Sequence, residues 1–275
     1  MKDRVLQLVG QAPQGQKRNV LREYVQAHVL LSLQSERAFE RLAFVGGTAL
    51  RFLYGLRRYS EDLDFTLEQR AGYRFSRLLE RIESDLVKAG FDVTMHPREI
   101  EPIHSAFIRL PGLPYEAGLS PHRTEKASIK IEIDTNPPQG ATLETTVINR
   151  HFLVALLHHD LPSLMAGKLH ALLTRPYTKG RDLYDLLWYL SRPEPTAPNL
   201  VLLKNALAQT EWRGTKVTAE TWKAVVEDKL RELDFREVAE DVGPFLERPE
   251  ERVLLTQETL LAALEKGHGG ASHGS

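Results

Sequence analysis

Two aspartates that are separated by one residue are the first side chains in this sequence that could do chemistry together. They are Asp62 and Asp64 of the segment SEDLDF, with Leu63 and Phe65 as apolar neighbours. If this segment is a strand, both carboxylates leave one face and the apolar side chains enter the core. Adjacent carboxylates repel each other, and a divalent cation relieves that repulsion; magnesium binds through one or two carboxylates plus substrate phosphates. Alone, the pattern is also typical of a turn or a solvated strand edge.

Two adjacent glycines, Gly46 and Gly47, precede the aspartates in the segment VGGTAL. The apolar run 42–45 before them and the segment that Thr48 opens predict a strand, a glycine turn and a helix. Such a turn exposes backbone N–H groups at the positive end of a helix dipole, without a side chain to exclude a phosphate. An ordinary tight turn is the alternative, and the nearby aspartates favour phosphate binding.

A third carboxylate comes from the segment SIKIEIDTN, where isoleucines alternate with polar residues and Asp134 ends the pattern. This alternation predicts a half-buried strand with Asp134 on its polar face. Two-metal phosphoryl transfer uses several carboxylates around its ions. Asp134 is therefore either a third metal ligand or a residue that ends a strand, and the pattern leaves both interpretations open.

The second half of the chain offers a lysine and two aspartates at helical spacing. Lys168 shares a helix stripe with Leu164 and Leu172, so it either extends to the surface or brings a point charge to a phosphate. Asp182 and Asp185 lie in the segment GRDLYDLLWYL. Asp182 could cap that helix, or either aspartate could orient Lys168 or an arginine, or accept a proton from an attacking hydroxyl.

The periodicity of apolar residues predicts strands in the first half and helices in the second. Strands are predicted at 42–45, 63–67, 91–95, 103–110, 128–134 and 144–148, and the loop at 111–123. Helices are predicted at 18–35, 73–88, 161–174, 181–190, 200–209, 219–230 and 256–266. We therefore expect a catalytic lobe with N-terminal helices over 1–150, a helical lobe that completes the active site over 151–266, and a disordered tail at 267–275.

The composition excludes several classes of protein. The 275 residues are 42% hydrophobic and 27% charged, close to globular averages, and contain no cysteine, so disulfides and thiolate metal sites are excluded. No apolar run is long enough to span a membrane, and the first residues lack a signal-peptide core, so we expect a cytoplasmic protein. The formal charge is -1, so a nucleic-acid partner would need a local basic patch. Candidates for such a patch are Arg57 with Arg58, and Arg175 with Lys179 and Arg181.

Four motifs, in this order, resemble the AbiEii family of nucleotidyltransferase toxins within the DNA polymerase beta-like superfamily. They are Gly46-Gly47-Thr48-Ala49-Leu50, Arg58-x-Ser60-Glu61-Asp62-Leu63-Asp64-Phe65, Lys168-Leu169-x-Ala171-Leu172 and Arg181-Asp182-Leu183-x-Asp185-Leu186. The resemblance covers roughly residues 40–190. It implies an α+β fold, with a mixed-sheet nucleotidyltransferase lobe and a helical C-terminal lobe.

The resemblance also implies roles for individual residues. Asp62, Asp64, Lys168 and Asp182 match catalytic positions. The two residues of the Asp-x-Asp pair, with Asp134 as a third ligand, would bind metal. The residues expected to contact the nucleotide are Gly46, Gly47, Thr48, Arg58, Ser60, Lys168 and Asp185. Magnesium is the expected metal, with manganese as an alternative, and a nucleoside triphosphate is the expected substrate.

The function implied by the resemblance is transfer of a nucleoside monophosphate to RNA, with the 3′ acceptor end of tRNA as the expected target and a block of translation as the result. A cognate antitoxin is the expected protein partner, and no membrane contact is expected. Two alternatives stay open at this point. The acceptor could be a protein side chain, or the chain could be a catalytically inactive nucleotide-binding module, although the retained carboxylates and Lys168 count against the second alternative.

Overall fold

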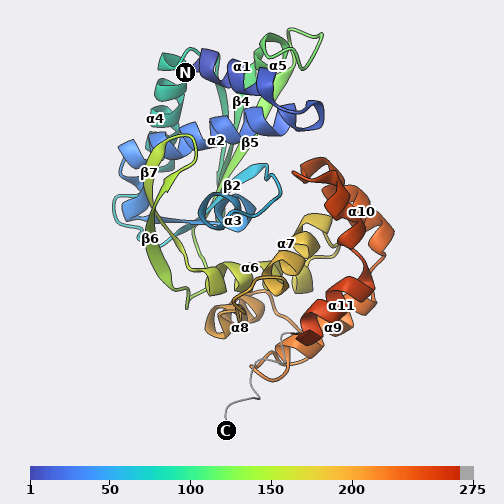
Figure 1. The fold of residues 1–275 in the computed structure, drawn as a ribbon. Helices are drawn as coiled ribbons and strands as arrows, with labels where there is room; N and C mark the ends of the chain where they lie inside the picture. Colours follow the sequence, from blue (N-terminus) through green and yellow to red (C-terminus); the bar gives the residue numbers. More distant parts are fainter. Residues whose placement is uncertain (267–275) are drawn as a thin grey trace. The chain divides into compact units, whose positions relative to one another are not determined.

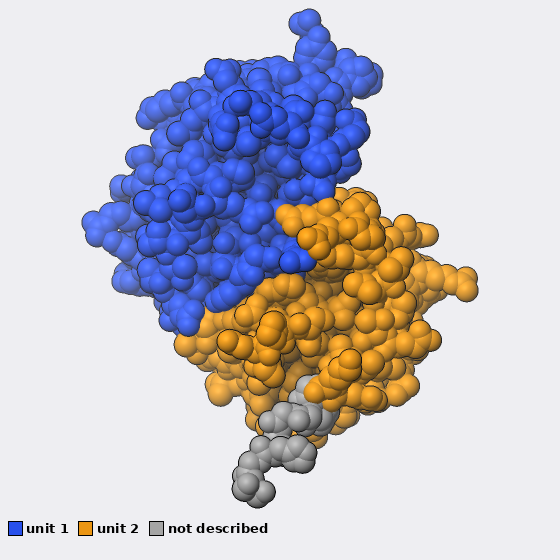
Figure 2. All heavy atoms as spheres, viewed as in Figure 1, with its two compact units in different colours: residues 1–137, 143–159 blue, residues 138–142, 160–275 orange. Residues whose placement is uncertain are grey.

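The computed structural model describes residues 1–266 and divides into two compact units (Figure 2). The first unit contains residues 1–137 and 143–159, and the second contains residues 138–142 and the chain from residue 160 onward. The expected boundary near residue 150 therefore precedes a strand that groups with the first unit. The tail 267–275, for which we expected disorder, lies outside the described residues.

The first unit is built on a seven-stranded mixed sheet (Figure 1). Its strands are β1 (Leu42–Val45), β2 (Asp62–Leu67), β3 (Thr94–Ile100), β4 (Ile103–Pro111), β5 (Lys126–Asp134), β6 (Leu143–Asn149) and β7 (Leu153–His159). Their order in the sheet is β3-β4-β5-β2-β1-β7-β6. Strand β2 runs antiparallel to β1 and parallel to β5, so the predicted mixed sheet is confirmed.

Alternation along the central strands separates a buried face of the sheet from a polar face. Leu63 and Phe65 of β2 are buried, as are the isoleucines of β5 on the same face. Their neighbours in the chain, including Asp62 and Asp64, leave the opposite face and are partly exposed. The expected position of the two aspartates on one strand face is therefore confirmed.

Five helices accompany this sheet: α1 (Lys2–Gln11), α2 (Lys17–Ser35), α3 (Gly46–Tyr54), α4 (Phe75–Lys88) and the short α5 (Leu113–Glu116). Single 3₁₀ turns occur at Gln14–Gln16 and Ala38–Glu40. Helix α2 crosses the sheet and contacts β5 and β7, with Val25 and Val29 fully buried (Figure 1). Helix α3 packs against β1 and β2, so it holds the glycine turn next to the two aspartates.

The second unit is helical, as the resemblance implies. It contains α6 (Leu161–Thr174), α7 (Gly180–Leu190), α8 (Leu200–Gln209), α9 (Trp222–Arg231), α10 (Phe235–Val242) and α11 (Gln257–Lys266), with 3₁₀ segments at Gly243–Phe245 and Pro249–Leu254. Asp160 caps α6, because its carboxylate accepts a hydrogen bond of 2.8 Å from the Ser163 N–H. Helix α6 packs against α7 and α8, and α7 packs against α10 and α11. No helix in residues 1–266 is long and apolar enough to cross a membrane.

Several local features of the fold differ from the predictions, and helix α10 was not predicted. Strand β7 was not predicted, because a short apolar run does not distinguish a strand from a buried helix. The strand predicted at 91–95 is β3 at Thr94–Ile100, whose exposed side chains carry no burial pattern and whose position is set by pairing with β4. The predicted loop at 111–123 contains the short helix α5.

Candidate active site

The glycine turn fits closely around side chains from the segment that contains the two aspartates. Gly46 has φ of +79°, and a Cβ atom there would lie 2.3 Å from Asp64 Oδ2. A Cβ atom on Gly47 would lie 2.6 Å from an Arg58 guanidinium nitrogen and 3.1 Å from Ser60 Oγ. The backbone conformation of Gly46 therefore favours glycine, and a Cβ atom on Gly47 would displace the side chain of Arg58. Helix α3 begins at Gly46, so the turn and the first helical residues coincide.

Three hydrogen bonds, from two side chains, hold the backbone that leads into β2. Thr48 Oγ1 donates to the Asp62 carbonyl oxygen. From α2, the buried Gln26 donates through Nε2 to the carbonyl oxygens of Ser60 and Glu61, at 3.1 and 2.9 Å. Gln26 is thus a positioning residue that the sequence did not indicate, because a glutamine within a helical pattern carries no distinctive spacing.

Arg58 is buried, with 2% of its surface exposed, and its Nη1 donates to the Tyr59 carbonyl oxygen at 2.9 Å. It therefore cannot belong to an exposed basic patch, and the prediction of such a patch from Arg57 with Arg58 was wrong. Its guanidinium instead lies against Gly47, at the turn. Contact of Arg58 with a nucleotide stays a prediction.

The register between β2 and β5 decides which carboxylates are neighbours. Asp64 is paired with Glu132, and Asp134 is paired with Thr66. Paired residues on adjacent strands are about 5 Å apart and share a face, whereas the next residue on that face lies about 7 to 8 Å away diagonally. Glu132 is therefore the β5 carboxylate opposite Asp64, and its Oε1 lies 2.7 Å from Lys130 Nζ.

Asp134 has contacts that suit the end of a strand. Its Oδ1 accepts a hydrogen bond of 2.9 Å from the Asn136 N–H. Burial raises the pKa of Asp134, the Asn136 N–H opposes this, and the negative charge of Glu101 adds to the increase. Among residues 1–266, no group of three or more His, Asp or Glu side chains forms a ready metal site.

A divalent metal nevertheless fits the donors that are present. Asp62 and Asp64 offer oxygen ligands on one partly exposed strand face, and the absence of a Cβ atom on Gly46 lets the Asp64 carboxylate lie directly against the glycine turn. Magnesium accepts one or two carboxylates and takes its other ligands from phosphates and water. The donor set is therefore suited to a metal that arrives with its substrate.

In the second unit, Lys168 lies between two buried aspartates. Its Nζ is 3.0 Å from Asp182 Oδ1 and 2.7 Å from Asp185 Oδ2, and Arg175 also pairs with Asp182. Asp185 is fully buried and Lys168 is 16% exposed in its side chain. The expected contact between these aspartates and Lys168 is present, so the lysine is not a solvated surface residue.

Helix α7 begins at Gly180, so Asp182 lies in its first turn and is not the cap. The Gly180 N–H instead donates to Asp241 Oδ2 at 2.8 Å, and a Cβ atom on Gly180 would meet the Val238 carbonyl oxygen at 2.1 Å. An acidic residue in the first turn interacts favourably with the helix dipole. The first turn of α7 therefore fixes the position of Asp182, and Lys168 and Arg175 neutralise its charge.

The second predicted basic patch is only partly available to a ligand. Arg175 is engaged by Asp182, and the Arg181 guanidinium carbon lies 4.3 Å from the centroid of the Phe245 ring. Both side chains therefore have structural partners within the second unit.

The motifs and the fold can now be compared with known proteins. A family model described as the nucleotidyl transferase AbiEii toxin of a type IV toxin-antitoxin system matches residues 28–263. The chain belongs to the AbiEii family. It is a toxin-type nucleotidyltransferase. The toxin-antitoxin system implies a cognate antitoxin, and nucleotidyl transfer implies a nucleoside triphosphate substrate.

Two solved structures share the fold of this AbiEii-family chain. One is described as a nucleotidyltransferase from H. pylori, with 18% identity and a TM-score of 0.56, and the match covers 92% of this chain and 97% of that one. The other is JHP933 from Helicobacter pylori, with 18% identity, a TM-score of 0.53 and 91% of each chain covered. No curated protein matches the chain. The predicted family and fold class are confirmed, while the roles of individual residues stay predictions.

Proposed function

We propose that this AbiEii-family toxin transfers a nucleoside monophosphate from a nucleoside triphosphate to RNA, at the 3′ acceptor end of tRNA, and thereby blocks translation. The observation that carries the proposal is the glycine turn packed directly against Asp64, on the strand that also bears Asp62. This arrangement supports the proposal, because backbone N–H groups that could bind phosphate lie beside carboxylates that could bind a metal.

Asp62 and Asp64 would hold magnesium, or manganese in its place, with a third carboxylate from β5. The register favours Glu132 for that third position, and Asp134 stays the prediction from sequence. When bound, the metal neutralises the triphosphate and stabilises charge on the attacking and leaving oxygens. The protein's part is to fix the strand, which the bonds from Thr48 and Gln26 support.

Gly46 and Gly47 would receive the triphosphate at the start of α3, where backbone N–H groups and the helix dipole favour negative charge. Ser60, whose hydroxyl lies next to Gly47, would add a donor to the same phosphates. Thr48 supports this turn through its bond to the Asp62 carbonyl oxygen, so its contribution to nucleotide binding would be indirect.

The reaction forms one bond and breaks one. The acceptor hydroxyl oxygen bonds to the α-phosphorus while the bond from that phosphorus to the bridging oxygen of pyrophosphate breaks, and the hydroxyl proton passes to a carboxylate base. The sequence predicts Asp182 or Asp185 for that base, and Lys168 for the charge that stabilises the phosphoryl group. The ion pairs around Lys168 support a fixed position for its ammonium group.

The experiment that tests the function uses the full chain, total cellular RNA, a cell extract depleted of RNA, and each α-labelled nucleoside triphosphate with magnesium. Label in RNA supports the proposal, and mapping of the labelled ends identifies the tRNA acceptor end or another site. Label in protein alone would replace the RNA acceptor by a protein side chain. Absence of label from both fractions would favour the inactive nucleotide-binding module.

A further inference from the structure

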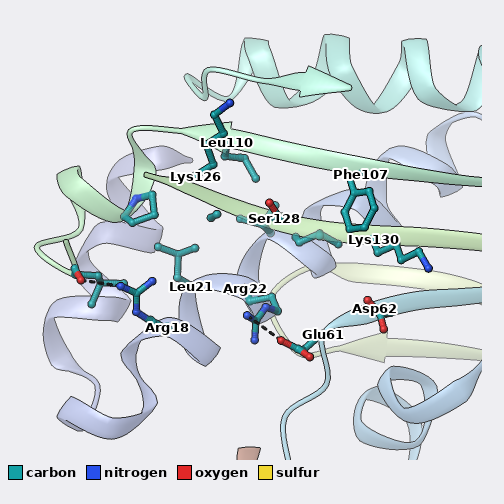
Figure 3. A pocket seen from close by; sticks show the side chains of 15 residues that line it. Arg18, Leu21, Arg22, Glu61, Asp62, Phe107, Leu110, Lys126, Ser128 and Lys130 are labelled. Carbon is teal, nitrogen blue, oxygen red and sulfur yellow. Dashed lines mark hydrogen bonds and ion pairs between the residues drawn. The ribbon is translucent and has the colours of Figure 1, made fainter. Parts of the chain in front are cut away.

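We infer that a pocket beside Asp62 is the acceptor site, and that it holds the end of a single RNA strand with a nucleobase against Phe107. This inference rests on the proposed function and names the place where the acceptor of that reaction binds. The pocket lies within the first unit and has a volume of about 360 Å³ (Figure 3). Ligand sites are typically about 300 to 1,000 Å³, so the volume suits one nucleoside.

The pocket exists because β5 is longer than β2 at one end. Strand β5 begins at Lys126, but its pairing with β2 begins only at Lys130, opposite Asp62. Residues 126–129 therefore pair with β4 alone within the described sheet. An unpaired strand edge presents backbone donors and acceptors to a ligand. The first turns of α2, including Leu21, face this gap and form the other wall (Figure 3).

An exposed aromatic side chain stands in line with the catalytic strand. Phe107 of β4 is paired with Lys130 of β5, which is paired with Asp62 of β2, so the three side chains form a row on one face of the sheet. Phe107 is 41% exposed, and Lys130 Nζ lies 5.9 Å from the centroid of its ring. A nucleobase can stack on such a ring whatever its sequence, because every base has a π-face.

Basic side chains outnumber acidic ones around the pocket. The basic residues are Arg18, Arg22, Lys126 and Lys130, and the acidic ones are Glu61 and Asp62. Three of these cations have carboxylate partners: Arg22 pairs with Glu61 at 3.3 Å, Arg18 with Glu125 at 2.6 Å and Lys130 with Glu132 at 2.7 Å. Lys126 is exposed at the start of β5, which makes it the cation to test. A groove with a cationic lining beside an aromatic ring is the combination that binds single-stranded nucleic acid.

The surroundings of the two aspartates distinguish the acceptor from the triphosphate. Asp64 contacts Gly46 of the turn, whereas Asp62 lines the pocket. In an in-line displacement the attacking and leaving oxygens lie on opposite sides of the phosphorus. Since the glycine turn suits the triphosphate, we assign the pocket on the Asp62 side to the RNA whose hydroxyl attacks the α-phosphorus.

The test measures binding without turnover. A 5′-fluorescein oligoribonucleotide of about eight nucleotides with a free 3′ hydroxyl is titrated with the full chain in EDTA, and anisotropy gives the dissociation constant. Phe107→Leu keeps an apolar side chain but removes the ring, and should weaken binding about 5- to 100-fold, as loss of one stacked base does. Phe107→Tyr keeps the ring and should bind like wild type. Lys126→Ala should lower the dependence of affinity on salt, whereas the matched control Lys88→Ala, at the exposed end of α4, should not.

Equal affinity of wild type and Phe107→Leu would overturn the inference, as would a wild-type chain that does not bind the oligonucleotide. A fluorescent nucleoside triphosphate is titrated in parallel with magnesium. If Phe107→Leu weakened only its binding, the pocket would hold the base of the donor nucleotide, and the inference would be wrong. The proposed function fails differently, by absence of label in RNA while the oligonucleotide still binds. If Phe107→Leu bound RNA with unchanged affinity and labelled it at the wild-type rate, the pocket would not be the acceptor site, but the proposed transfer to RNA would still hold.

Discussion

Asp64 on β2 and Glu132 on β5 are paired residue to residue in two parallel strands, so their carboxylates leave the same face of the sheet. Asp134, the carboxylate that the sequence pattern indicated, is paired instead with Thr66. Asp134 therefore lies two residues further along β5 than the residue opposite Asp64, so Glu132 is the β5 carboxylate that can share a metal with Asp64. Glu132 and Asp134 lie on the same face of β5, so the effects of replacing each carboxylate can be compared directly.

We predict that Glu132→Gln lowers the apparent affinity for magnesium in the transfer reaction by at least about 10- to 100-fold, which is the usual effect of losing even an outer partner of a metal site. Asp134→Asn should change this affinity much less, because Asp134 lies opposite Thr66 and not opposite Asp64. The measurement is transfer rate against magnesium concentration for both variants. The reverse order of effects would make Asp134 the third ligand.

A second prediction concerns Gln26, which holds the backbone of Ser60 and Glu61. Gln26→Leu removes both donors, and displacement of the aspartate strand by about 1 Å can lower a rate about 100-fold. The free energy of unfolding should fall by about 1 to 3 kcal/mol. The matched control is Gln34→Leu on the same helix, because Gln34 accepts a bond from the Ala155 N–H of β7 instead. Equal transfer rates for the two variants would show that Gln26 does not position the aspartate strand for the reaction.

Lys168 gives a third prediction, in which stability and chemistry can be separated. Lys168→Met leaves Asp182 and Asp185 buried with one partner fewer, and removal of one member of a buried pair costs about 3 to 5 kcal/mol. A second change, Asp185→Asn, removes one of the stranded charges and should restore part of the melting temperature. Because Asp185 is itself a candidate base, the reference is Asp185→Asn alone, and the transfer rate of the double variant should stay about 100- to 1,000-fold below that reference, as expected for loss of a fixed charge contact.

The transfer rate and the melting temperature are measured together for the single and double variants of Lys168. Lys168→Arg keeps the charge but replaces a compact ammonium by a planar group, and should restore the rate only in part. A double variant that is as fast as Asp185→Asn alone would show that Lys168 acts only on stability.

Glu23 gives a prediction about pH. Burial raises its pKa, but the His151 hydrogen bond and the charges of Arg51 and Arg150 outweigh burial and bring the pKa from its ordinary value of 4.5 to about 2. A carboxyl whose pKa is lower in the folded chain stabilises the fold above the ordinary value, and this contribution is lost as the pH falls toward the folded value. The shift corresponds to about 3 kcal/mol of unfolding free energy.

The corresponding measurement is urea unfolding, followed by circular dichroism, at pH 7, pH 4 and pH 2.5 for wild type and Glu23→Gln. Wild type should lose more stability than the variant between pH 4 and pH 2.5, because only wild type carries this titrating carboxyl. At pH 7 the variant should be the less stable of the two, because Arg51 and Arg150 lose their charged partner. Parallel losses in the two proteins would contradict the assigned role of Glu23.

Most of the fold could be predicted because its elements carry their own signals. Helix α6 at Leu161–Thr174 and α8 at Leu200–Gln209 have the predicted bounds, since both combine helical periodicity with clear ends. Strand β7 could not be recognised from a short apolar run, and β3 depends on its partner β4. Pairing between strands is a long-range interaction, so local sequence carries little of it.

The candidate site was predictable where chemistry is concentrated in short motifs. Asp62 and Asp64 were recognised from their spacing within one apolar segment. The turn at Gly46 and Gly47 was recognised from two adjacent glycines that follow an apolar run. Glu132 was missed because its place opposite Asp64 depends on the strand register, although its position on the polar face of β5 was a signal that could have been used. Gln26 could be identified only from its hydrogen bonds across the fold.

The most direct test of the central claim is transfer of α-labelled nucleotide to RNA by wild type, Asp62→Ala and Asp64→Ala, with magnesium present and folding checked by circular dichroism. Each variant removes a partly exposed carboxylate and no core group, so both should stay folded. We expect label in RNA from wild type and none above background from either variant. Full transfer by both folded variants would contradict the assignment of these two aspartates to the metal and the reaction.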